Sequence, residues 1–389
     1  MTTNWKRLAL VSSTALGLLI VLAIIGAFVA YNRFIAPEAP TNLAVPQELT
    51  TAGVLLGKDV LAKSTYVQDA RLGTVSEIAI GTLDPKQGHR IVIVGSKGAL
   101  FLDGSAQPQS FVLFSVHASH VNILDVDGNG IFEFVDRGGG WQDVSLMDHK
   151  GNAIWTYGGI PGVDDLAAGD LDGNGILDFV VGFNGSGGVR LLDRAAKEIW
   201  KQPDGNVWHV ELADADADGK PEIIHSNAEG KMTVRDGDGK AIRSMKLGPY
   251  FSFFSLARWP DKKSAQYALF AEDNVIWLFD FFGKSVAQFA APASGSLGDA
   301  RGVPFRIRID HPEYFASVVA FANWDKSVLY VHGPTKNLVY QEIIPEECPS
   351  ITSIPSETGI KEDLLVGCDQ TVFRYSGIAQ PSKLQSTPE

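Results

Sequence analysis

Short apolar runs alternate with polar turns along most of the chain and recur with a nearly constant spacing. The clearest repeat unit is an apolar run that ends in Asp, followed by a turn with Gly or Lys and a second apolar run. The Asp of this unit is found at Asp103, Asp148, Asp193, Asp236 and Asp280, at intervals of 45, 45, 43 and 44 residues. A repeat of this length with several short strands is typical of a β-propeller blade. The pattern therefore predicts an all-β propeller of four-stranded blades.

The number of repeats favours seven blades, although six or eight stay open because one repeat is long. The last repeat has strands expected at 351–354, 363–366 and 372–375 but no fourth strand before the chain ends. We expect the segment at 54–62, which precedes the first repeat, to supply that missing strand. A first strand that completes the last blade closes the ring and leaves no open sheet edge. The propeller is therefore expected to span 54–378, followed by a flexible tail at 379–389.

The amino-terminal region is apolar and free of charge from residue 8 to residue 31, which is long enough to cross a bilayer. A Lys-Arg pair precedes this run. We therefore expect a cytoplasmic stub at 1–7, a transmembrane signal-anchor helix at 8–31, and the propeller on the periplasmic or cell-surface side. A cleaved signal peptide is the alternative, but it has a shorter apolar region, and the best cleavage position would put Phe28 at −3. Three prolines indicate a semi-extended stalk over 32–53.

Three acidic loops recur within this pattern, one in each of three consecutive repeats. Each has side-chain oxygens at positions 1, 3, 5 and 9, with Gly at position 6. Alternate oxygens on a sharply turned loop suit Ca²⁺, which takes six to eight oxygen ligands in a flexible geometry. We expect the main-chain carbonyl at position 7 to add another. The predicted ligands of about three calcium ions are Asp125, Asp127, Asn129, Ile131, Glu133, Asp170, Asp172, Asn174, Ile176, Asp178, Asp214, Asp216, Asp218, Lys220 and Glu222.

An EF-hand is the main alternative for such loops, and the sequence disfavours it. An EF-hand loop needs a bidentate Glu at position 12 and flanking helices. Position 12 is Asp136, Val181 or His225 here, and the flanking runs are typical of strands. Bound calcium would also offset part of the formal net charge of −12. That negative charge, with no basic stripe along the chain, disfavours nucleic acid as a partner.

The acidic loops resemble those of FG-GAP/VCBS repeats, the calcium-loop blades of integrin α-subunit heads and of many bacterial surface proteins. The resemblance is carried by Asp-x-Asp-x-Asn/Asp-Gly-x-x-Asp/Glu at a blade period over residues 121–226, whereas the Phe-Gly…Gly-Ala-Pro pattern of the family name is nearly absent. The Asp…Gly-Lys-x-Ile-Trp turns also resemble those of quinoprotein-type and outer-membrane assembly propellers. The resemblance implies structural calcium in loops on one rim and ligand binding on the opposite face.

Three polar side chains occupy the same position in consecutive repeats, five residues before the first Asp of each acidic loop. They are His120, Asp165 and His209. If the first strand of each blade lines the central channel, these side chains gather at its mouth, opposite the acidic loops. Such a set can bind a ligand, perform acid–base chemistry or simply line a wet channel. Trp141 and Trp208 lie in nearby loops, where aromatic rings can stack on sugars or anchor a protein partner.

Together these features favour an exported, membrane-anchored, calcium-stabilised module that binds a protein or a glycan, for example in cell adhesion. The alternative is a polysaccharide lyase or hydrolase that acts at the channel mouth with His120, Asp165 and His209. No nucleophile elbow or phosphate-binding loop indicates another class of enzyme. Cys348 and Cys368 fall in one late repeat, and the sequence leaves open whether they form a disulfide or stay separate thiols.

Overall fold

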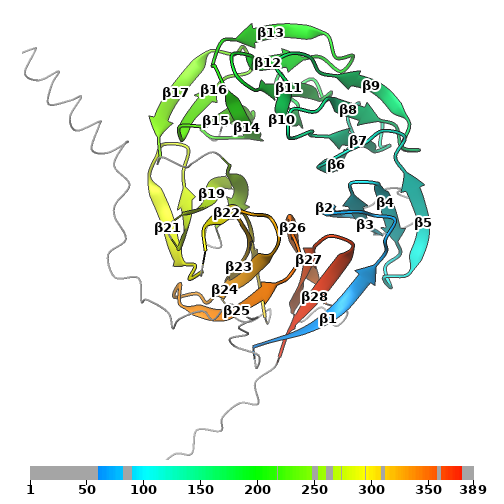
Figure 1. The fold of residues 1–389 in the computed structure, drawn as a ribbon, viewed down its shortest axis with the longest axis vertical. Coiled ribbons are helices and arrows are strands. Elements are labelled where there is room, and N and C mark those ends of the chain that lie inside the picture. Colours follow the sequence, from blue (N-terminus) through cyan, green and yellow to red (C-terminus); the bar gives the residue numbers. More distant parts are fainter. Residues whose placement is uncertain are drawn as a thin grey trace, which may run out of the picture.

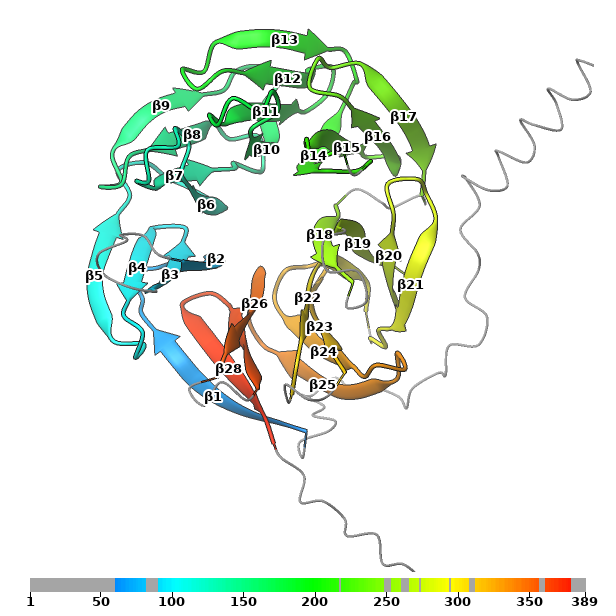
Figure 2. The same ribbon diagram turned by 180° about the vertical axis from the view of Figure 1, so that it is seen from behind.

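The computed structural model describes residues 60–378, apart from gaps at 82–89, 217, 248–252, 260–265, 273, 294, 308–311 and 357–360. These residues form 28 β-strands in seven antiparallel four-stranded sheets. The sheets are arranged around a central axis as the blades of a propeller (Figure 1), and Figure 2 shows the same ring from behind. The all-β fold with seven four-stranded blades, predicted from the sequence, is confirmed.

Within each of blades 1 to 6 the strands follow one another in chain order from the inner to the outer edge of the ring (Figure 1). Blades 1 to 3 comprise β2 (Val75–Gly81), β3 (Arg90–Gly95), β4 (Gly98–Leu102) and β5 (Pro108–Leu113); β6 (Val121–Leu124), β7 (Glu133–Asp136), β8 (Val144–Met147) and β9 (Ala153–Tyr157); and β10 (Val163–Gly169), β11 (Asp178–Phe183), β12 (Gly188–Leu192) and β13 (Glu198–Gln202). Blades 4 to 6 comprise β14 (Val207–Ala213), β15 (Glu222–Asn227), β16 (Lys231–Arg235) and β17 (Ala241–Lys246); β18 (Ser255–Arg258), β19 (Gln266–Glu272), β20 (Val275–Phe279) and β21 (Ser285–Ala290); and β22 (Leu297–Phe305), β23 (Tyr314–Phe321), β24 (Ser327–His332) and β25 (Leu338–Ile344).

The ring closes in blade 7 between the first and the last strands of the described chain. This blade comprises β26 (Ser350–Pro355), β27 (Glu362–Gly367), β28 (Thr371–Gly377) and, as its outer strand, β1 (Leu61–Gln68). β1 pairs antiparallel with β28, and Figure 1 shows the two strands side by side, β1 in blue and β28 in red. The predicted closure is therefore present, but its strand extends to residue 68, beyond the predicted 54–62. Only Leu61 of β1 is fully buried. An outer strand needs no continuous apolar pattern, so the sequence did not reveal how far β1 extends.

The repeated Asp marks the turn between the third and fourth strands of a blade. In blade 2 the Asp148 carboxylate accepts hydrogen bonds from the backbone N–H groups of Lys150 and Asn152, at 2.9 and 2.8 Å. Gly151, with φ of 80°, supplies the left-handed residue that closes this turn. The same side-chain bonds recur at Asp193, so the period of the Asp residues is the period of the blades.

Neighbouring blades are joined by packing and by a recurring hydrogen bond at the outer strands. The ring of Trp155 meets Phe179 of the next blade edge-on at 5.0 Å, and its Nε1 donates to the backbone carbonyl of Arg194 at 3.0 Å. Trp200, one blade further, donates to the carbonyl of Gly237 in the same way. These contacts join blade 2 to blade 3 and blade 3 to blade 4 at the outer side of the ring.

The predicted segments at both ends of the chain lie outside the described residues. These segments are the cytoplasmic stub at 1–7, the anchor helix at 8–31, the stalk at 32–53 and the tail at 379–389. In the part of the chain that is described, no helix has the length and apolar character that crossing a membrane requires.

Candidate functional site

A cavity of about 540 Å³ opens at one end of the central channel, and residues from all seven blades line it. Its walls are the first residues of the inner strands and the turns between second and third strands. This end lies opposite the acidic loops, because each inner strand starts at the cavity and ends at the loop. The structure brings all five predicted ligand residues to the cavity: His120, Trp141, Asp165, Trp208 and His209. That they bind a ligand stays a prediction.

A repeated β-bulge turns one side chain of several inner strands into the cavity. In β2, β10 and β14 the register with the second strand shifts at the same place, near the start of the strand. The residues that these shifts leave unpaired are Ser76, Asp164 and Trp208, and all three line the cavity. Bulges redirect side chains in this way near functional sites.

Asp165 and His209 belong to a buried ion cluster with two residues that sequence reasoning did not select. Arg137 donates two hydrogen bonds to Asp165, at 3.1 and 3.0 Å, and Oδ2 of Asp165 lies 2.6 Å from Nδ1 of His209. Glu211 lies 3.2 Å from Arg137 and 3.3 Å from Nε2 of His209. The cluster therefore joins blades 2, 3 and 4 across the channel wall.

The pairing of charges sets the protonation states in this cluster. Burial raises the pKa of Asp165, but the positive charges of Arg137 and His209 outweigh it and hold that pKa well below its usual value. Burial also opposes the protonation of His209, yet Asp165 and Glu211 raise its pKa to about 9. At neutral pH the cluster thus contains two positive and two negative charges, which cancel.

Asp165 also forms a contact between inner strands that other blades make with serine. Its Oδ2 accepts the backbone N–H of Val210 in blade 4 at 2.9 Å. Ser76 bonds to both backbone groups of Val121 in blade 2, at 3.0 Å each. Ser255 and Ser350 donate to the inner strands of blades 6 and 1, respectively. This recurrence favours a structural role for Asp165, whereas His120 presents an exposed side chain to the cavity.

Three carboxylates of the cavity lie outside this ion cluster, with Arg301 as the one other lining guanidinium among the described residues. Asp164, Asp299 and Glu347 form no salt bridge with any residue of the described chain, although Asn184 donates a hydrogen bond to Asp164 at 3.2 Å. Burial, with the charge of Asp165, raises the pKa of Asp164 to about 6. Burial also raises the pKa values of Asp299 and Glu347. The cavity thus holds negative charge that the protein does not neutralise.

Aromatic side chains surround the mouth of the cavity and stay partly in solvent. Trp141 is 67% exposed, Trp324 is 42% exposed and Phe253 is 37% exposed. Both tryptophans have left-handed backbones, with φ of 69° and 60°. A bulky residue rarely adopts this conformation, which costs about 1 to 2 kcal/mol. Strained residues of this kind concentrate at functional sites, where the surrounding structure holds them in place.

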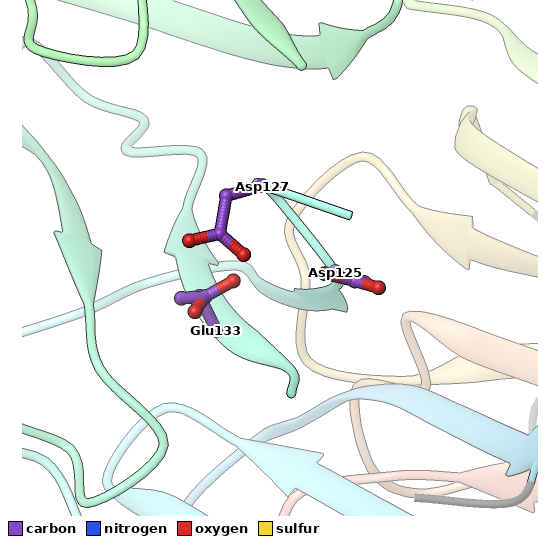
Figure 3. Close-up of side chains that lie close together, drawn as sticks. All are labelled: Asp125, Asp127 and Glu133. Carbon is purple, nitrogen blue, oxygen red and sulfur yellow. The ribbon is translucent and has the colours of Figure 1, made fainter. Parts of the chain in front are cut away.

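The acidic loop of blade 2 brings three carboxylates together at the opposite end of the channel. One oxygen each of Asp125, Asp127 and Glu133 lies within 4.8 Å of the others. Figure 3 shows these three side chains on the loop and on the strand that follows it. The backbone N–H groups of Asn129 and Gly130 donate to Asp125, at 3.1 and 2.9 Å, and fold the loop around it. This oxygen set fits a hard divalent cation.

The three acidic loops are alike in backbone but not in their carboxylate positions. In blade 4, Asp214, Asp216 and Asp218 also come within 4.8 Å of one another. In blade 3, Asp170 accepts backbone hydrogen bonds as Asp125 does, but no such group of oxygens forms among the described residues. Burial and the neighbouring Asp172 raise the pKa of Asp178 to about 6. This excess negative charge is what a bound cation would offset.

Two predicted calcium ligands accept hydrogen bonds within their own loops, and an arginine lies beside one of the loops. The side chains of Asn129 and Asn174 accept the backbone N–H groups of Ile131 and Ile176, both at 2.7 Å. The carbonyls of those two isoleucines and of Lys220, and the carboxylate of Glu222, stay predicted ligands. Arg194 of the next blade lies 2.9 Å from Asp127, so blade 2 already has a partial counter-charge.

Comparisons with known proteins identify the fold but no family. No protein-family model matches the sequence, and no curated protein matches it. The structure is similar to that of BBS1N in complex with ARL6DN, with a TM-score of 0.53, 13% identity, and 85% of this chain and 99% of that chain covered. It is also similar to a streptogramin B lyase, with a TM-score of 0.56, 9% identity, and 82% and 99% covered. BamB from Moraxella catarrhalis gives a TM-score of 0.45 at 14% identity, with 86% and 98% covered. The first two similarities show the propeller fold alone.

Proposed function

We propose that this protein is a binding module that holds a protein or glycan ligand in the cavity at the mouth of its channel. The observation that carries this proposal is the ring of exposed aromatic side chains around a preformed cavity. Concave sites with aromatic walls and a few convergent polar groups are where ligands bind, and tryptophan is the strongest anchor residue at interfaces. Among proteins of the same fold, BBS1N binds a protein partner, ARL6DN, which makes such a role reasonable by analogy.

The proposal includes structural Ca²⁺ in the acidic loops, as in FG-GAP/VCBS blades. Asp125, Asp127 and Glu133 in blade 2, and the three aspartates of blade 4, supply converging oxygens for it. A bound ion would offset their mutual repulsion and fix the turn between the first two strands of the blade. In this role calcium acts on the stability of the ring and not on the ligand directly. Asp172→Ala is expected to lower the number of bound ions by one, as measured by equilibrium dialysis.

The proposal also includes a location outside the cytoplasm, with the chain anchored by residues 8–31. The charge-free apolar run, preceded by basic residues, supports it. Fractionation of cells, followed by protease treatment of intact cells or spheroplasts, tests this part. Recovery of the protein in the soluble cytoplasmic fraction would contradict it.

A pull-down and a glycan array with the full chain in detergent test the binding function. The parent protein is expected to retain a ligand, and the double variant Trp141→Ala/Trp324→Ala is expected to lose it while keeping its melting temperature. Both assays are run with calcium and with a chelator, because the proposed ions act on stability. If neither assay yields a ligand that depends on the two tryptophans, the proposed function is wrong.

Catalysis at the same cavity is the second candidate, as a polysaccharide lyase or hydrolase. The observation that favours it is the pKa of Asp164, which burial raises to about 6, in a range suited to acid–base catalysis. Against it, Asp165 and His209 of the predicted catalytic set are engaged in the buried ion cluster, which leaves His120. A glycan panel decides between the candidates: turnover that Asp164→Asn and His120→Gln abolish supports the enzyme, and no turnover by the parent protein excludes it.

A further inference from the structure

We propose that the cavity selects an organic cation, an ammonium or guanidinium group on an apolar chain. This inference rests on the proposed binding function and narrows its ligand. It comes from the distribution of charge in the cavity and from the aromatic side chains at its mouth.

The cavity has a surplus of negative charge. The buried cluster of Arg137, His209, Asp165 and Glu211 is neutral as a whole, so it offers no net charge to a ligand. Outside this cluster, three lining carboxylates, Asp164, Asp299 and Glu347, face one lining guanidinium, that of Arg301. The His120 side chain is open to the cavity, but the surrounding wall partly desolvates it. This desolvation, and then the charges of Arg301 and Arg137, lower its pKa, so His120 adds no positive charge at neutral pH. Two negative charges are therefore left without a counter-charge among the described lining residues.

Aromatic rings lie beside these carboxylates in the cavity wall. Trp141, Trp208, Phe253 and Trp324 line the cavity together with these carboxylates. The ring centroids of Trp208 and Phe253 lie 6.2 Å apart, so these two rings form one apolar part of the wall. Aromatic faces attract cations, and they do so more strongly where water is displaced. A cation on an apolar chain would satisfy both the rings and the carboxylates.

Other ligand classes satisfy this cavity less well. An anion would meet the surplus negative charge. A neutral sugar could stack on the tryptophans, but it would remove water from Asp164, Asp299 and Glu347 without supplying a counter-charge. Desolvating a charge without a partner is costly, so the carboxylates disfavour this outcome.

Charge on the cavity carboxylates also lowers the stability of the folded protein, as is common at functional sites. Burial raises the pKa of Asp164, which means that its charged form is less stable in the folded protein than in water. The folded protein is therefore expected to become more stable when this charge is removed. Residues that reduce stability yet are placed together in a cavity are typical of binding sites.

Isothermal titration calorimetry on the full chain in detergent tests the inference with matched probes. The cationic probes are the methylamides of acetyl-lysine and acetyl-arginine. The neutral probes of similar shape are the methylamides of acetyl-norleucine and acetyl-citrulline. We expect a cationic probe to bind about tenfold more tightly than its neutral analogue or better, which is the effect of one favourable charge pair. We expect Asp164→Asn, Asp299→Asn and Glu347→Gln each to reduce this preference.

Asp325→Asn is the matched control, because it makes the same charge change at an exposed residue beside Trp324 that does not line the cavity. It is expected to leave binding unchanged, and melting temperatures verify that every variant is folded. Equal binding of cationic and neutral probes, or unchanged binding by all three cavity variants, would overturn the inference.

Two further arms identify the source of the cation and separate this inference from the proposed function. Tighter binding of a nonapeptide with a central lysine than of the lysine amide indicates a protein side chain, and equal binding indicates a free small cation; both support the inference. Neutral oligosaccharides that bind equally to the parent and to Asp164→Asn, but not to Trp141→Ala/Trp324→Ala, would overturn the cation inference and leave the binding function. If no probe binds and the pull-down also yields nothing, both are wrong.

Discussion

Nδ1 of His209 lies 2.6 Å from Oδ2 of Asp165, so a salt bridge crosses the boundary between blades 3 and 4 inside the channel wall. Arg137 of blade 2 contacts the same aspartate. The inner strands β10 and β14 and the turn that follows β7 in blade 2 are thus held together by charges as well as by apolar packing. Buried pairs of this kind are costly to break, because the remaining partner keeps its charge without a counter-charge.

The first prediction concerns Arg137. Arg137→Met is expected to lower the free energy of unfolding by about 3 to 5 kcal/mol, because it leaves Asp165 and Glu211 with His209 as their only cation in the cluster. Urea denaturation monitored by tryptophan fluorescence measures the change. Arg71→Met is the matched control, since Arg71 pairs with Asp69 on the surface, where such pairs contribute roughly 1 kcal/mol or less. Equal effects of the two substitutions would show that the cluster adds nothing beyond a surface pair.

The second prediction is a loss of stability at alkaline pH. The pKa of His209 is about 9 in the folded protein, and a free histidine titrates at about 6.5. Because the pKa is raised, the stabilisation of the folded protein by protonated His209 is fully present below about pH 6.5 and is lost as pH rises towards 9. The free energy of unfolding, measured at several pH values between 6 and 9, is expected to fall by about 2 to 3 kcal/mol. His209→Gln should flatten this dependence, whereas His149→Gln, at an exposed turn, should keep it. A profile that is equally steep in His209→Gln would refute the assignment.

The third prediction concerns the left-handed backbone of Trp141. Glycine accepts this conformation without steric cost, and two-thirds of the Trp141 side chain is in solvent. Trp141→Gly is therefore expected to keep the stability of the parent or raise it, by up to about 1 kcal/mol, while ligand binding is lost. Ala196→Gly is the control, because Ala196 has φ of 61° in a turn remote from the cavity. It should change stability similarly and leave binding intact. A destabilised Trp141→Gly would mean that the ring contributes mainly to packing.

The sequence predicted blades 2 to 4 well because each contains two independent markers. The acidic loop fixes the end of the first strand and the start of the second, and the repeated Asp fixes the outer turn. In blade 2 the acidic loop begins directly after β6 and ends at Glu133, the first residue of β7, and Asp148 lies in the turn between β8 and β9. The predicted end of the closing strand, residue 62, fell short of Gln68, because only Leu61 of β1 is fully buried and the strand therefore has no apolar period to detect.

The polar cavity residues at the starts of inner strands could be predicted from the sequence only in the blades that contain an acidic loop. His120, Asp165 and His209 could be aligned because each precedes an acidic loop by the same interval. Asp299 and Glu347 lie in blades without such loops, so no marker fixed their position relative to the channel. In blade 3 a bulge turns Asp164 into the cavity. The bulge adds one residue to the strand, so a strict alternation of inward and outward side chains could not predict where Asp164 points.

The fourth prediction concerns the acidic loops. Removal of Ca²⁺ with a chelator is expected to lower the melting temperature, because an ion that binds only the folded protein stabilises it. Asp214→Asn should reduce both the number of bound ions and this shift, since Asp214 belongs to a group of converging carboxylates. Asp236→Asn is the matched control, because Asp236 lies in an outer turn and bonds to the backbone N–H of Lys240. A melting temperature that does not respond to calcium or chelator would rule out the proposed ions.

The fifth prediction concerns blade 7, where a disulfide joins Cys348 to Cys368 across a separation of 20 residues. A loop of this length is expected to stabilise the folded protein by about 3 kcal/mol, because the bridge restricts the unfolded chain. The double variant Cys348→Ser/Cys368→Ser should therefore unfold at lower urea concentration, and so should the parent protein in a reducing agent. The reducing agent should not affect the double variant, which serves as the control. Because Glu347 and Pro349 of the cavity wall flank Cys348, loss of the bridge is also expected to weaken ligand binding. Unchanged unfolding of the parent under reduction would show that the bridge does not contribute to stability.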